Sequence, residues 1–85
     1  MMLARPLDLD GVIAFVRVVD LGSFTRAAEA LATSQAAVSL RLKRLEDRIG
    51  ARLLDRTPRH VAVTRQGELF LPAARRLLEA HDSAL

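Results

Sequence analysis

The sequence predicts a mainly α-helical fold in which three helices are followed by a short β-hairpin and one longer helix. Apolar residues recur at helical spacing over most of the chain, glycines stand where helices would end, and two short β-capable runs flank a proline. The chain has 85 residues and no cysteine, so it is long enough for one small domain that has neither disulfide nor zinc support.

Two helices are predicted in the first part of the chain. The first runs from a cap at Asp8 or Asp10 to about Val19, because its apolar residues fall on one side of a helix. The second covers 24–31 with Ser23 as its cap, and its alanines keep it slim. We expect both helices to turn their apolar sides toward a common core.

The third predicted helix, over 35–49, has the clearest pattern in the chain. Thr33 or Ser34 caps it, and Gly50 ends it. A narrow buried stripe is expected from Val38, Leu42, Leu45 and Ile49. The opposite face carries Ala36, Ser39, Leu40 and Lys43, with Arg44 at its flank. A face that is small and hydroxylic at its start and basic further along suits close approach to a polyanion.

A β-hairpin and a last helix are predicted next. The runs 53–56 and 61–64 flank a turn that contains Pro58, which predicts two short strands joined by a basic tip. The last helix is expected from about Arg65 to Ala84, with Thr64 as its cap.

The last helix has an apolar face too wide for one small domain to bury, with an arc of roughly 200°. The face consists of Leu69, Phe70, Leu71, Ala73, Ala74, Leu77, Leu78, Ala80 and Leu85. The excess predicts pairing with the same helix of another subunit. The interface is expected to contain Phe70, Ala74, Leu77 and Leu78. The chain is thus divided into a domain over 1–64 and a dimerisation helix over 65–85.

Positive charge is concentrated between residues 41 and 65. This stretch holds eight basic and three acidic residues, a net of +5 in a chain whose formal net charge is +3. All but one of the eight are arginines, whose planar guanidinium suits phosphates and base edges. A solvated helix face with a polar loop is the commoner source of such a cluster, so charge alone does not establish nucleic-acid binding.

The order of the elements indicates a function. Two short helices separated by a tight break, the second with a polar outer face, form a helix-turn-helix. In that motif the start of the second helix meets base edges in the major groove. The basic hairpin that follows corresponds to a wing, whose tip crosses the phosphate backbone and places an arginine in the minor groove. The sequence therefore predicts a winged helix-turn-helix that binds double-stranded DNA.

The motifs along the chain resemble the signature of LysR-type regulators. They are Ser23-Phe-Thr-Arg-Ala-Ala-Glu-Ala-Leu31, Ser34-Gln35-Ala-Ala-Val-Ser39, Leu45-Glu46, Gly50, Leu53-Leu-Asp-Arg56 and Val63-Thr64-Arg-Gln-Gly67. The resemblance covers nearly the whole chain, in order and without gaps. It implies a cytoplasmic bacterial transcriptional regulator whose winged helix-turn-helix is followed by a linker helix that pairs two subunits. Members bind inverted repeats near promoters as homodimers or, at full length, as tetramers.

The resemblance also implies regulation by a small molecule. Family members carry a larger effector-binding domain beyond the linker helix, and co-inducers bind there. These 85 residues do not contain that domain, so no cofactor is expected in this chain. The chain stops within an apolar helix, which favours an excised fragment over a natural single-domain form.

DNA contacts are assigned by the resemblance position by position. Gln35 matches a glutamine that contacts bases, and Ser39 matches a hydroxyl residue near bases and phosphate. Arg59 matches the wing residue that enters the minor groove, and Thr25 resembles a backbone-contacting position. The full set expected to contact DNA is Thr25, Ser34, Gln35, Ala36, Ser39, Leu40, Arg41, Lys43, Arg44, Arg56 and Arg59.

Two neighbouring residues depart from the family pattern. Leu40 stands where arginine is frequent. An exposed leucine on a helix is ordinary, but on this face it also suits a thymine methyl group, and both explanations stay open. Arg41 replaces a common glutamine and is a substitute phosphate contact, although it points away from the outward face.

Enzymatic and metal sites are not expected. His60 and His81 lie far apart with no cysteine or carboxylate at metal spacing, and no serine has a histidine placed to activate it. No stretch is apolar enough to span a bilayer, and the N-terminus lacks a secretory pattern. The alternative function is a winged-helix module that docks proteins without binding DNA, and Leu40 alone points toward it.

Overall fold

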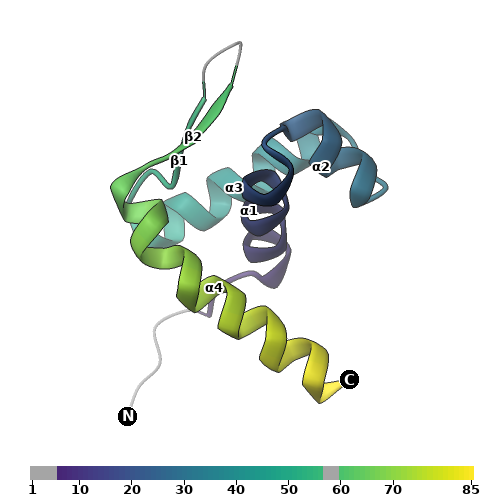
Figure 1. Cartoon of the computed structure of the whole chain (residues 1–85), viewed down its shortest axis with the longest axis vertical. Coiled ribbons are helices and arrows are strands. Elements are labelled where there is room, and N and C mark those ends of the chain that lie inside the picture. The colour runs from purple at the N-terminus through teal and green to yellow at the C-terminus, as the bar shows by residue number, and fades with distance from the viewer. Residues whose placement is uncertain (1–5, 57–59) are drawn as a thin grey trace.

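Residues 6–56 and 60–85, the part of the chain that the computed structural model describes, form four helices and one antiparallel hairpin. The elements are α1 (Leu9–Leu21), α2 (Phe24–Ala30), α3 (Gln35–Ile49), β1 (Leu54–Arg56), β2 (Val61–Val63) and α4 (Arg65–Ala84). α1 lies at the centre and packs against α2, α3 and α4, while the hairpin projects from the helices (Figure 1). This is the mainly α-helical, winged helix-turn-helix fold that the sequence predicts.

The four helices begin at side-chain caps, as predicted. Each cap accepts a hydrogen bond from a backbone N–H two or three residues further on, and the caps are Asp8, Ser23, Ser34 and Thr64. The bounds of α3 and α4 are those expected. α1 extends two residues further, to Leu21, and α2 ends one residue earlier, at Ala30. Differences of this size are usual at helix ends, where the last turn frays.

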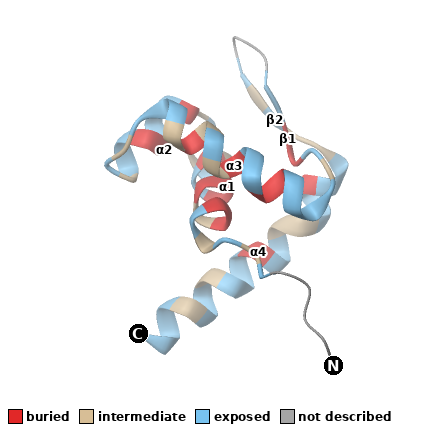
Figure 2. Ribbon diagram, turned by 180° about the vertical axis from the view of Figure 1, so that it is seen from behind, coloured by how far each residue is buried: buried red, intermediate tan, exposed pale blue. Residues whose placement is uncertain are grey.

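The core forms where α1 crosses the other helices. Its fully buried large side chains are Val12, Phe15, Val18, Val38, Leu42, Leu45, Leu53 and Leu54. Gly11 lets α1 and α3 approach closely, because a Cβ there would lie 2.9 Å from the carbonyl oxygen of Arg41. Buried positions gather on the facing sides of the helices, and the outer sides are exposed (Figure 2). The outer side of α3 is therefore free to contact another molecule.

The buried stripe of α3 differs from the predicted one at its C-terminal end. Ile49, expected in the stripe, is 36% exposed, whereas Glu46 is only 7% exposed. Ile49 is the last residue of the helix, and the chain turns away at Gly50, which has a left-handed φ of 83°. Glu46 faces the base of the hairpin, where its carboxylate accepts the backbone N–H groups of Leu53 and Leu54. The prediction that Ile49 is buried is thus wrong, because Ile49 stands at the very end of α3, where the chain leaves the helix at Gly50.

β1 and β2 form the hairpin that was predicted between α3 and α4. They pair antiparallel with Leu54 opposite Val63 and Arg56 opposite Val61. The expected runs were one residue longer at the base of the hairpin. The tip, residues 57–59, lies outside the described residues, so the predicted role of Arg59 stays a prediction.

α4 is attached to α1 by one side of its first half. The rings of Phe15 and Phe70 have centroids 5.7 Å apart and are tilted by 41°. Ala74 is fully buried and belongs to the core of its own subunit. Its predicted place in a dimer interface is therefore wrong, since no surface of this small side chain remains for a partner. Within the described ranges, no helix is long and apolar enough to cross a membrane.

Candidate nucleic-acid interface

The turn between α2 and α3 sets the direction of α3. Ala32 adopts a left-handed φ of 53° in this turn. The backbone N–H of Thr33 donates to the carbonyl oxygen of Ala28 at 3.0 Å. Ser34 then caps α3 by accepting from the N–H of Ala37, also at 3.0 Å. These local bonds hold the first turn of α3 in a fixed position beside α2.

Most of the residues predicted to contact DNA lie on one outward surface. Those that are exposed are Thr25, Ser34, Gln35, Ala36, Leu40, Lys43, Arg44 and Arg56. Ser39 and Arg41 are half-buried. All but two of this set belong to α3 or its cap, and Thr25 and Arg56 extend the surface onto α2 and the hairpin. The structure thus places the eight exposed residues on α3, its cap and the neighbouring elements, whereas Arg59 lies outside the described residues.

Thr25 and Gln35 join the two helices of the motif at this surface. The hydroxyl Oγ1 of Thr25, in the first turn of α2, donates to Oε1 of Gln35 at 3.4 Å. Both side chains are exposed. The bond places Gln35, the first residue of α3, next to a residue that was assigned to the same surface from the resemblance alone.

Lys43 has an intramolecular partner one turn along the helix. Its Nζ lies 3.4 Å from each carboxylate oxygen of Asp47, and both side chains are about two-thirds exposed. An exposed pair of this kind contributes at most about 1 kcal/mol. Lys43 can therefore exchange Asp47 for a phosphate at little cost.

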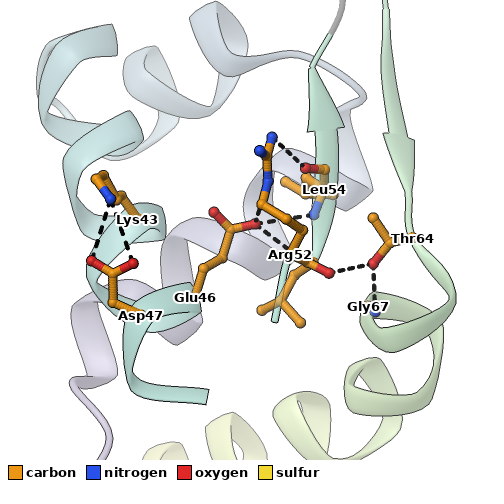
Figure 3. A network of polar contacts seen from close by, with 8 residues as sticks. Lys43, Glu46, Asp47, Arg52, Leu54, Thr64 and Gly67 are labelled. Atoms are coloured by element: carbon orange, nitrogen blue, oxygen red, sulfur yellow. Dashed lines mark hydrogen bonds and ion pairs between the residues drawn. The ribbon is translucent and has the colours of Figure 1, made fainter. Parts of the chain in front are cut away.

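Glu46 connects α3 to the base of the hairpin, a role that the sequence reasoning missed. Its Oε2 accepts the backbone N–H of Leu53 at 2.7 Å and that of Leu54 at 3.3 Å. The Nε of Arg52 lies 3.8 Å from the same oxygen (Figure 3). Its position in the sequence could have indicated this role, because Glu46 follows the buried Leu42 by one helical turn and so lies on the edge of the buried stripe.

Thr64 closes the other side of the hairpin base. Its hydroxyl donates to the carbonyl oxygen of Arg52 at 2.6 Å and accepts the N–H of Gly67 at 3.0 Å (Figure 3). Its own N–H donates to the carbonyl oxygen of Leu53 at 3.0 Å. One residue therefore caps α4 and also fixes that helix to the chain that enters β1.

Arg56 ties the hairpin to α2. Its guanidinium carbon lies 4.8 Å from the ring centroid of Phe24, the first residue of α2. Contacts of this kind between a cation and an aromatic face contribute about 0.5–1 kcal/mol where they are exposed. Arg56 was predicted as a DNA contact, and the structure gives it this second role of orienting the wing relative to the helix-turn-helix.

An open hollow lies between the second half of α3 and the hairpin base. It is lined by Lys43, Glu46, Asp47, Gly50, Ala51, Arg52 and Arg56. Its lining holds the cations Lys43, Arg52 and Arg56 and the carboxylates of Glu46 and Asp47, so its formal charge is positive by one. Within the described ranges, no three His, Cys, Asp or Glu side chains gather as a metal site. The surface between α3 and the wing is thus suited to anionic groups.

The predicted dimer residues on α4 differ in exposure. Leu77 is 37% exposed, whereas Phe70 and Leu78 are half-buried against the core. Leu69, on the same wide face, is 68% exposed. α4 is also held to α1 by an ion pair, in which Nη2 of Arg75 donates to Oδ1 of Asp20 at 2.8 Å and Nη1 to Oδ2 at 3.3 Å. The hydrogen bond from Arg75 is the main cause that lowers the pKa of Asp20.

Comparisons with known proteins agree with this geometry. The family model of bacterial regulatory helix-turn-helix proteins of the lysR family matches residues 9–68. The HTH-type transcriptional regulator CrgA of Neisseria meningitidis is 48% identical over 70 residues, which are 82% of this chain and 23% of CrgA. The chain spans about a quarter of the length of the curated relatives that it matches.

Two solved structures share the fold. The BenM DNA-binding domain, in complex with catB site 1 DNA, superposes with a TM-score of 0.84 at 36% identity, over 91% of this chain and 86% of that one. DarR of Vibrio fischeri, also in complex with DNA, gives a TM-score of 0.87 at 30% identity, over 93% of this chain and 27% of that one. From the family match, the relatives and these structures, the chain belongs to the LysR family of bacterial regulatory helix-turn-helix proteins.

Proposed function

We propose that this chain is the sequence-specific DNA-binding domain of a transcriptional regulator and binds an inverted-repeat operator as a homodimer. The observation that carries the proposal is the outward face of α3, where Gln35, Ala36 and Leu40 are exposed. In a helix-turn-helix this face enters the major groove. Support comes from the BenM domain, which matches nearly all of this chain and is bound to DNA.

Charge around α3 supports the same proposal. Arg44 is exposed beside the outward face, and Lys43, Arg52 and Arg56 line the hollow next to it. Each cation that neutralises a phosphate releases condensed counterions, so affinity falls as salt rises. The wing base is tied to α3 by Glu46 and to α2 by Arg56, so a phosphate contact there has a fixed distance from the bases that α3 meets.

Homodimer formation is assigned to the exposed part of the α4 face. Leu69 and Leu77 leave apolar surface on a helix that extends from the core (Figure 2). A second copy of the same helix covers such a face symmetrically and places two α3 helices for the two halves of an inverted repeat. The role is non-enzymatic and cytoplasmic, and a co-inducer acts through an effector-binding domain that these 85 residues do not include.

The experiment that tests the proposal is selection of duplexes from a random pool, followed by fluorescence anisotropy with the selected duplex at several salt concentrations. We expect an enriched inverted repeat, bound at least about 10³-fold more tightly than random duplex. Binding without enrichment at every protein concentration would contradict sequence-specific recognition. No binding even at low salt would instead favour a protein-docking module.

A matched pair of arginine variants tests whether the salt dependence of binding arises from the surface around α3. Arg44→Ala should lower the slope of log affinity against log salt by about 1, because one phosphate contact is lost. Arg76→Ala removes another exposed arginine, from α4, and serves as the control. Equal slopes for the two variants would contradict the assignment of Arg44 to the DNA surface.

A further inference from the structure

Leu40 is a large apolar side chain at the most outward position of α3. It is 49% exposed, whereas the buried residues of this helix are Val38, Leu42, Leu45 and Glu46. Two residues of α-helix correspond to a rotation of about 200°, so Leu40 points about 160° away from both Val38 and Leu42. It therefore has no part in the core of the domain.

The residues around Leu40 indicate what kind of partner surface this side chain would contact. Ala36 lies one turn before it on the same face, and Lys43 and Arg44 lie one turn after it, all exposed. A partner helix would need a stripe of large apolar residues, and on this face Leu40 is the only such residue. Its surroundings fit a polyanion that presents one apolar group among polar ones.

The major groove of DNA is a surface of that kind. Base edges there present hydrogen-bond donors and acceptors, and the apolar group among them is the C5-methyl group of thymine. A leucine has no donor or acceptor, so it cannot satisfy the polar edges of guanine, adenine or cytosine. Against a thymine methyl it buries apolar surface on both sides.

We propose that Leu40 is a specificity-determining residue that packs against the C5-methyl group of one thymine in each half-site. The proposal rests on the proposed function, since it requires α3 to lie in the major groove. Under this proposal, the chain prefers a T·A base pair at one position of each half-site, and this position is different from the one that Gln35 contacts. Removal of a single buried methyl contact is expected to weaken binding about three- to five-fold per half-site.

The test removes the methyl group without changing any hydrogen-bonding edge. Each thymine of the selected duplex is replaced in turn by deoxyuridine, and the dissociation constant is measured by anisotropy for the wild-type chain and for Leu40→Ala. At one thymine per half-site, the wild-type chain should lose about three- to five-fold in affinity. Leu40→Ala should bind the thymine and deoxyuridine duplexes within about 1.5-fold of each other.

Two controls separate this contact from other causes. Leu40→Ala replaces an exposed side chain with the best helix former, so the variant should fold, which far-UV circular dichroism will check. Ile49→Ala truncates another partly exposed apolar residue of α3, away from the outward face, and should keep the full deoxyuridine effect of the wild-type chain.

The outcomes distinguish this inference from the function on which it rests. A specific duplex whose affinity depends on a thymine methyl equally in the wild-type chain and in Leu40→Ala would overturn the role of Leu40 but leave DNA recognition intact. So would a specific duplex with no dependence on any thymine methyl. If no duplex is enriched from the random pool, the proposed function and this inference fail together.

Discussion

The carboxylate of Glu46 in α3 accepts the backbone N–H of Leu53 at 2.7 Å, and this bond connects α3 to the base of the hairpin. The same oxygen also accepts the N–H of Leu54, the first residue of β1. Buried N–H groups need acceptors, and here a buried side chain supplies both. Glu46 is therefore a positioning residue that sets the wing relative to α3.

Removal of the Glu46 carboxylate should destabilise the domain. In Glu46→Ala two buried N–H groups lose their acceptor, and we expect the free energy of unfolding to fall by about 2–4 kcal/mol. Glu46→Gln keeps one acceptor oxygen and should lose less. Urea denaturation measures both, with Asp47→Ala as the neighbouring control, expected within about 0.5 kcal/mol of the wild-type chain. A wild-type midpoint for Glu46→Ala would contradict this assignment.

Replacement of Ala32, in the turn before α3, by glycine should stabilise the domain. A left-handed backbone conformation costs a residue with a Cβ about 1–2 kcal/mol, and glycine avoids this cost. Glycine also has more conformational freedom in the unfolded chain, which offsets about 0.5–1 kcal/mol of the stabilisation. Ala32→Gly is thus expected to raise the free energy of unfolding by about 0.5–1 kcal/mol. Ala73→Gly, at an exposed position within α4, should lower it by a similar amount. Destabilisation by both variants would refute the strain at Ala32.

The ion pair between Asp20 and Arg75 should make stability depend on acid pH. The pKa of Asp20 is lowered by the hydrogen bond from Arg75 and by the positive charges of Arg75 and Arg17, which outweigh the opposing effect of burial. Because its pKa is lower in the folded chain, the pair stabilises at pH values above the unfolded pKa of about 3.9. That contribution is lost as pH falls through the folded pKa.

The measurement is urea denaturation between about pH 6 and pH 2 for the wild-type chain and Asp20→Asn. The two curves should converge at the acid end, and the wild-type chain should be more stable at the neutral end. Curves that stay parallel over the whole range would show that Asp20 does not contribute in this way.

Local features of the fold could be predicted from the sequence. Ser34 and Gly50 bound α3 at the predicted residues, because a cap acts through hydrogen bonds to N–H groups two or three residues away, and a left-handed glycine ends a helix by its own backbone. The outward face of α3 was also predictable, since helical periodicity alone separates it from the buried stripe.

Contacts between distant segments could not be predicted. The apolar width of α4 was apparent, but periodicity does not reveal which part of the face packs on α1, and Ala74 was therefore assigned to the wrong surface. Gly67 resembled an ordinary motif residue, yet a Cβ there would clash with the carbonyl oxygen of Leu53 and lie 2.7 Å from Cγ1 of Val63. Such close approaches depend on tertiary packing that the sequence does not encode locally.

The most direct test of the central claim, that the outward face of α3 contacts bases, is the specificity ratio of Gln35→Ala. The ratio is the dissociation constant for random duplex divided by that for the selected inverted repeat, measured at one salt concentration. Loss of a base contact should lower this ratio by the equivalent of about 1–3 kcal/mol while leaving affinity for random duplex nearly unchanged. An unchanged ratio would contradict the claim and remove Gln35 from the recognition surface.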